Sequence, residues 1–206
     1  MSRLWRRPAL LIAITAVLML TAGLAVGWVA GTSAPGNDSV EAGFARDMQT
    51  HHQQAVEMAM YEWANGSDTA MRTIAYDIAT TQSTEIGMYR TWLRDWGVEL
   101  SSGEPMAWAG DEHAHDSAET GGLMPGMATD EQMEEFKSLT GAEADVMFAD
   151  LMIAHHVGGV DMARAALDRT DNELVETAAR RTISNQQSEI ENLENHRDNI
   201  LNAVEE

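Results

Sequence analysis

The sequence predicts an all-α protein: a four-helix bundle made of two duplicated helical hairpins, preceded by one N-terminal transmembrane helix. Three observations predict this fold. An apolar run without charges occupies residues 8–30, and four long proline-free segments carry apolar residues at three-to-four spacing. Two blocks of sequence also repeat at a constant offset, which takes His51 to His155.

The first element in chain order is the apolar run. As a helix with a rise of ~1.5 Å per residue it is about 34 Å long, enough to cross a bilayer. Three arginines precede it and Trp28 lies near its far end, an order that favours a cytoplasmic N-terminus and a body outside the cell membrane. A cleaved signal peptide, which would give a secreted body, is the alternative. We favour an uncleaved single-pass anchor, because Pro35 is a poor residue directly after a cleavage site.

The segments that follow read as helices joined by short breaks. Short connections between long helices make antiparallel neighbours, so each half of the body should be a helical hairpin. Thr129–Gln132 opens a further short helix with a capping-box pattern. The expected parts are an anchor and tether at 1–34 and a bundle domain at 35–206, with helices at 39–64, 69–96, 142–168 and 172–203, repeat halves at 39–97 and 142–203, a crossover loop at 98–128 and a short helix at 129–140.

The composition limits what this body can bind. The chain of 206 residues has a net charge of −20, and residues 1–34 hold three arginines and no acid, so the remainder carries 10 − 33 = −23. This acidity, with no basic patch, argues against a nucleic-acid partner. The absence of cysteine excludes thiolate zinc sites, iron–sulfur clusters and disulfides. Any metal must therefore be held by His, Met, carboxylate or backbone.

The repeat places histidine and methionine on one helix face. On a helical projection Met48, His51, His52 and Met58 share an arc of about 120°. The second half carries the same pattern in Met152, His155, His156 and Met162. Because a lone Met or His on an apolar face is usually a core residue, the pattern's recurrence in register is what favours a metal site.

One carboxylate in each half should face these histidines. Glu85 and Glu189 lie in otherwise apolar stripes beside Gln82 and Gln186. An isolated buried carboxylate costs several kcal/mol, so we expect the imidazoles of the facing helix to be its partners. Each glutamate either ligates a metal directly or orients a ligand histidine. Thioether suits Cu(I) and imidazole suits several metals, so copper is the preferred ion, with zinc or iron as alternatives.

The crossover loop carries a second set of candidate ligands: Met106, His113, His115, Met124 and Met127. They either capture metal loosely or belong to a solvated linker. His196, at the position that Trp92 has in the first half, breaks the repeat and is a weaker candidate.

The blocks FARDMQTHHQQAVEMA, TTQSTEIGMYRTWLRDWG, LMPGM and FADLMIAHHVGGVDMA resemble the family called domain of unknown function 305, from about Ser39 to about Leu201. The resemblance implies a ferritin-like four-helix bundle, commonly exported or membrane-anchored, with some periplasmic copper-binding members. It also implies that the eight His and Met residues above are motif positions, joined by Met124 and Met127. One departure is that Met88 has Asn192 as its counterpart in the second half.

These observations predict a membrane-anchored extracytoplasmic protein that binds copper for sequestration or transfer without turning over a substrate. A ferritin-like metal oxidase is one alternative. Di-iron bundles use two Glu-x-x-His motifs, and neither half has a glutamate three residues before its histidine pair. A structural or partner-binding module without metal is the other alternative, and the sequence leaves a homodimer open.

Overall fold

The computed structural model describes residues 19, 34–101, 103–110 and 122–205. The expected membrane helix at residues 8–30 lies outside the described residues, apart from Met19. No helix among the residues that the structure describes is both long and apolar enough to cross a membrane. The elements are α2 (Val40–Asn65), α3 (Thr69–Trp96), a 3-10 turn η1 (Ala107–Ala109), α5 (Asp130–Phe136), α6 (Ala142–Leu167) and α7 (Glu173–Glu205).

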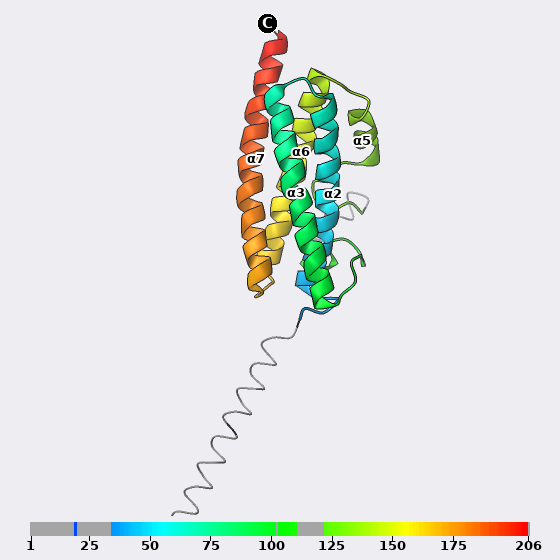
Figure 1. Ribbon diagram of the computed structural model, residues 1–206, viewed down its shortest axis with the longest axis vertical. Helices are drawn as coiled ribbons and strands as arrows, with labels where there is room; N and C mark the ends of the chain where they lie inside the picture. Colours follow the sequence, from blue (N-terminus) through cyan, green and yellow to red (C-terminus); the bar gives the residue numbers. More distant parts are fainter. Residues whose placement is uncertain (1–18, 20–33, 102, 111–121, 206) are drawn as a thin grey trace, which may run out of the picture. The chain divides into compact units, whose positions relative to one another are not determined.

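Within Gly36–Glu206 the four long helices lie side by side as two hairpins (Figure 1). Helix α2 packs along α3, helix α6 packs along α7, and the hairpins meet mainly through α2 and α6. The all-α prediction is confirmed, and the described body contains helices and no strand. The short helix α5 ends at Phe136, before the predicted residue 140, because Lys137 and Ser138 leave the helix in a turn.

Polar side chains fix where the helices begin. The Ser39 hydroxyl accepts a hydrogen bond from the Ala42 amide at the start of α2, and the Asp68 carboxylate accepts one from Met71 at the start of α3. At α5 the expected capping box forms between Thr129 and Gln132. Such caps satisfy amides that have no partner inside the helix, which is why the predicted boundaries lie close to the observed ones.

The core divides into two clusters of buried side chains. We call them the Met48 cluster and the Met58 cluster. The first includes Met48, Tyr89, Leu93, Met106, Met124 and Met162. The second includes Met58, Ile78, Phe136, Phe148, Met152 and Leu193. Each cluster therefore takes methionines from both halves of the repeat, as two antiparallel copies of one hairpin require.

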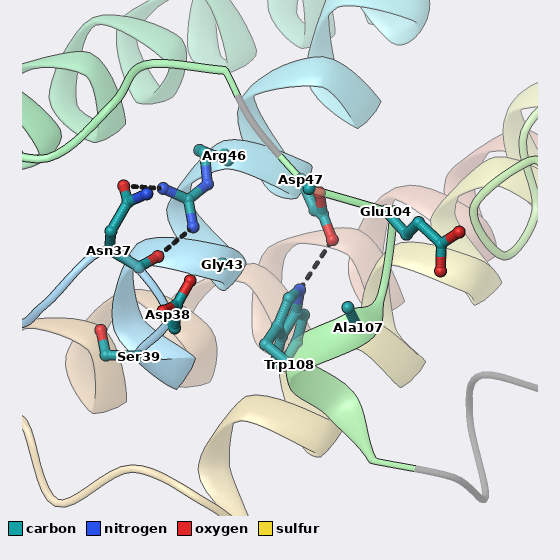
Figure 2. A pocket seen from close by; sticks show the side chains of 10 residues that line it. Asn37, Asp38, Ser39, Gly43, Arg46, Asp47, Glu104, Ala107 and Trp108 are labelled. Atoms are coloured by element: carbon teal, nitrogen blue, oxygen red, sulfur yellow. Dashed lines mark hydrogen bonds between the residues drawn. The ribbon is translucent and has the colours of Figure 1, made fainter.

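The first part of the crossover loop is fastened to α2 (Figure 2). The Asp47 carboxylate accepts hydrogen bonds from the Met106 amide and the Trp108 indole, both at 2.7 Å. Burial raises the pKa of Asp47, while these two donors oppose that rise. Trp108 lies directly over Gly43, where a Cβ would come within 2.4 Å of the indole ring, so the loop can dock only on a glycine.

Candidate metal site

The fold brings the four predicted histidines together in the middle of the bundle. His51 and His155 lie where α2 meets α6, with ring centroids 3.7 Å apart and ring planes 33° from parallel. His52 lies 6.4 Å from His51, and His156 lies 6.2 Å from His155. All four side chains are fully buried.

The two outer histidines are held by glutamates, as the sequence predicts. The His52 Nε2 atom lies 2.8 Å from the Glu85 carboxylate, and the His156 Nε2 atom lies 2.7 Å from the Glu189 carboxylate. Glu85 is on α3 and Glu189 is on α7, so each bond joins the two helices of one hairpin. The carboxylates remain partly exposed while the imidazoles do not. Each glutamate thus links a buried ring to the surface.

The two inner histidines are held by backbone carbonyls. His51 donates from Nε2 to the Pro125 carbonyl, and His155 donates from Nε2 to the carbonyl of His51, each at 3.0 Å. A carbonyl oxygen can only accept, so both Nε2 atoms carry the hydrogen. Burial, with the nearby His52, lowers the pKa of His51 to about 3, and burial beside His51 lowers the pKa of His155 well below its usual value. Both rings are therefore neutral near pH 7.

This arrangement leaves the other ring nitrogen bare. The Nδ1 atoms of all four histidines are buried and have no hydrogen-bond partner among the described residues. In a neutral imidazole whose Nε2 donates, Nδ1 carries a lone pair. A buried lone pair without a partner is costly, and holding one ring nitrogen by an acceptor so that the other can ligate is how metal-binding histidines are oriented.

The four predicted methionines flank these rings in two pairs. Met48 and Met162 belong to the Met48 cluster, and Met58 and Met152 belong to the Met58 cluster. Each pair therefore contains one thioether from α2 and one from α6. All four side chains are fully buried. Met124 is buried in the Met48 cluster, and Met127 packs against that cluster from the loop.

The candidate ligands combine imidazole nitrogens with thioether sulfurs. Within the described residues, no three His, Asp or Glu side chains are placed to hold one ion. Glu85 and Glu189 contact the histidines through Nε2, the position of an orienting partner rather than of a ligand that shares the ion. Any ion bound here would need the thioethers as well as the imidazoles.

The remaining candidate ligands, in the crossover loop and on α7, lie in different surroundings. Met106 is buried in the Met48 cluster. His113 and His115 lie outside the described residues. His196 lines a surface cavity near Asp68 and Asp145, at the end of the bundle where α3 and α6 begin.

Sequence reasoning missed the residues that dock the loop over His51. The Gln54 side chain forms a two-way bond with the Ala128 backbone, donating at 2.9 Å and accepting at 2.8 Å. On α6, Gly158 faces the Pro125 carbonyl so closely that a Cβ would lie 2.0 Å from it. The signal for this contact was the Gly158–Gly159 pair inside a helix, where glycine is unfavourable unless another chain approaches closely.

Comparison with known proteins supports the resemblance. The sequence profile of the domain of unknown function (DUF305) matches residues 41–197. A crystal structure of a DUF305 protein of Streptomyces coelicolor, described as secreted, is 41% identical; the match covers 76% of this chain and 90% of that one, with a TM-score of 0.67. A DUF305 fragment from Deinococcus radiodurans is 27% identical, over 80% of this chain and 99% of that one, with a TM-score of 0.65.

A third similar structure is CopM in its Cu(I)-bound form, 20% identical over 78% of this chain and 96% of that one, with a TM-score of 0.60. At this identity the likeness concerns the fold. No curated protein matches the chain. The profile match and the Streptomyces relative together show that the chain belongs to the DUF305 family.

Proposed function

We propose that this protein binds copper, as Cu(I), in the middle of the bundle and serves in copper sequestration or transfer. The ligands in this proposal are the Nδ1 atoms of His51, His52, His155 and His156 and the thioethers of the two methionine pairs. Met124 and Met127 supply further thioethers from the loop. Glu85 and Glu189 hold the outer rings in place.

The observation that carries the proposal is the set of four buried Nδ1 atoms that have no hydrogen-bond partner among the described residues, on the same two helices as two pairs of buried thioethers. A core built only for packing gains nothing from four imidazoles with unpaired nitrogens, because each costs free energy. Thioether and imidazole together, without thiolate, form a donor set suited to Cu(I). CopM, a protein with a similar fold, has been solved in Cu(I)-bound, Cu(II)-bound and Ag-bound forms.

We also propose that the bundle works outside the cytoplasm, tethered by residues 1–34 as a single-pass anchor, or secreted if that segment is cleaved. The apolar run with arginines before it supports an exported body. The Streptomyces relative, described as secreted, supports the same compartment.

Two other functions would use the same residues differently. A structural module would keep the His–Glu pairs as buried hydrogen-bond networks. The lack of three His, Asp or Glu side chains around one point, within the part of the chain that the structure describes, favours this alternative. A metal oxidase would need carboxylates free to ligate, and here Glu85 and Glu189 are already bonded to histidine.

The test is a competition titration of Cu(I) against a chelator with the full chain purified in detergent. Met48→Leu with Met162→Leu removes one thioether pair at nearly constant volume. We expect this double variant to lower Cu(I) affinity by about tenfold or more, equivalent to about 1.4 kcal/mol, with its unfolding temperature little changed.

Met71→Leu is the matched control, because Met71 is equally buried but lies on α3 outside the site. Its Cu(I) affinity should equal that of the wild type. His51→Ala and His155→Ala should also weaken binding. If the wild type binds no Cu(I), the copper function is wrong; bound iron with oxygen consumption would instead support an oxidase.

A further inference from the structure

A groove of about 590 Å³ runs between α3 and α7 over one half of their interface. One wall carries Thr84, Glu85, Met88 and Trp92 from α3. The other wall carries α7 residues, which include Leu174, Thr177, Ala178 and Arg181. The groove is thus lined by both polar and apolar side chains, with one carboxylate, Glu85, and one thioether, Met88, three residues apart on α3.

The groove reaches the buried histidines through Glu85. Its carboxylate is 20% exposed and lies 2.8 Å from the Nε2 atom of His52, which has no exposure at all. Glu85 therefore stands between solvent in the groove and the first imidazole of the site. A cation that moves along this wall meets a negative charge directly outside the ring.

Met88 lies one helical turn beyond Glu85 on the same wall. It is partly buried and packs against the Met48 cluster, which contains Met48 and Met162. Met88 therefore lies between the groove and the cluster that contains one of the buried methionine pairs. Soft sulfur ligands favour Cu(I) over hard cations.

The interface between α3 and α7 differs between its two ends, although the two helices are copies of each other. At the groove end, α7 contributes the small side chain of Ala178. The counterpart of Ala178 in α3 is Ile74, a larger side chain that packs against the Met58 cluster. Met88 is replaced by Asn192 in the copy. The thioether wall therefore belongs to the His52 side alone.

We propose that this groove is the route by which Cu(I) enters and leaves the bundle, with Met88 as the first thioether that the ion meets. The proposal rests on the copper-binding function proposed above. Arg181 also lines the groove, and its positive charge opposes long residence of a cation there. The groove is in that respect suited to passage rather than storage.

The test measures the rate of Cu(I) loading and of release to a chelator, with the equilibrium affinity determined on the same samples of full chain. Thr84→Trp places a large side chain in the groove from an exposed position, so the fold should be kept. We expect it to slow loading and release by about tenfold, which is about 1.4 kcal/mol in barrier height, with affinity unchanged. Met88→Leu should slow both rates as well.

Two matched controls use the same chemical changes elsewhere. Ser188→Trp alters the counterpart of Thr84, an exposed position beside Glu189 that does not line the groove. Met60→Leu removes an exposed thioether from α2. Both should exchange Cu(I) at the wild-type rate.

Wild-type rates in Thr84→Trp, or equal slowing in Ser188→Trp, would overturn the route while leaving the copper function intact, since the affinities are known independently. A wild type that binds no Cu(I) would overturn the function and the route together.

Discussion

Each histidine in the middle of the bundle has an acceptor at Nε2, and its Nδ1 atom has no hydrogen-bond partner in the part of the chain that the structure describes. The residue types and their spacing predicted that the four rings share one region and that Glu85 and Glu189 would contact them. The acceptors of the inner pair could not be predicted, because the partner of His51 is a carbonyl 74 residues away in an irregular loop. A backbone carbonyl leaves no mark in the sequence.

Burial also changes the chemistry of an acid that lies outside the candidate metal site. Glu62 is fully buried, and its carboxyl oxygens have no hydrogen-bond partner among the described residues. Burial and the nearby Asp145 raise its pKa from 4.5 to about 9. Asp145 itself is held by the Ser67 and Asp68 amides at the start of α3. Glu62 therefore stays protonated at neutral pH.

This raised pKa predicts how Glu62 affects stability. The unfolded chain gives up the proton near pH 4.5 and the folded chain near pH 9, so the stability that Glu62 contributes is full below pH 4.5 and falls as pH rises towards 9. Glu62→Gln removes the penalty. The variant should therefore gain stability relative to the wild type between pH 5 and 9, by more than about 1 kcal/mol at pH 8.

Chemical denaturation at several pH values measures this difference, with Glu194→Gln, an exposed change on α7, as control. A difference between Glu62→Gln and wild type that stays constant from pH 5 to 9 would mean that the Glu62 carboxyl is not protonated in the fold.

At the scale of elements, the helices and their ends followed from periodicity and caps, whereas the path of the crossover loop did not. The loop is fixed by contacts that depend on two segments meeting: Gln54 with Ala128, and Gly158 with Pro125. Gly126, in a left-handed conformation at φ 74°, brings its own backbone against the Ala154 carbonyl. Only the fold of the bundle puts these segments side by side.

The close approach at Gly158 predicts an unusual effect of alanine in a helix. Gly→Ala in a helix interior ordinarily stabilises by about 0.5–1 kcal/mol. In Gly158→Ala the new Cβ would lie 2.0 Å from a backbone carbonyl, so the loop must move and the bond from His51 to Pro125 is lost. We expect a net loss of about 1–3 kcal/mol in the free energy of unfolding.

Gly87→Ala is the control, because Gly87 lies in α3 and a methyl group added there would have no neighbouring atom within 4 Å. That variant should gain stability in the same urea denaturation experiment. If Gly158→Ala gains as much as Gly87→Ala, the loop does not rest on α6 in solution.

At the scale of the whole molecule, the repeat explains why the site is central. Two copies of one hairpin, packed through α2 and α6, bring His51 beside His155. The same packing places Met48 in one cluster with Met162, and Met58 in the other cluster with Met152. The offset of the repeat predicted this pairing in outline. It could not show which end of the α3–α7 interface stays open, because that depends on packing between helices from different halves.

The charge of the chain is divided unevenly between its N-terminal segment and its body. The body is strongly acidic and the segment before the apolar run is basic. An acidic surface favours solubility and raises the local concentration of cations. The lack of cysteine leaves histidine, methionine, carboxylate and backbone as the ligands of any metal that this protein binds.

The central claim is that imidazole and thioether bind the same copper. X-ray absorption at the copper edge of the Cu(I)-loaded full chain tests it most directly. We predict both nitrogen and sulfur neighbours around the copper, with the sulfur contribution reduced in Met48→Leu with Met162→Leu and unchanged in Met71→Leu. A spectrum with nitrogen or oxygen neighbours alone, identical in both variants, would contradict the account.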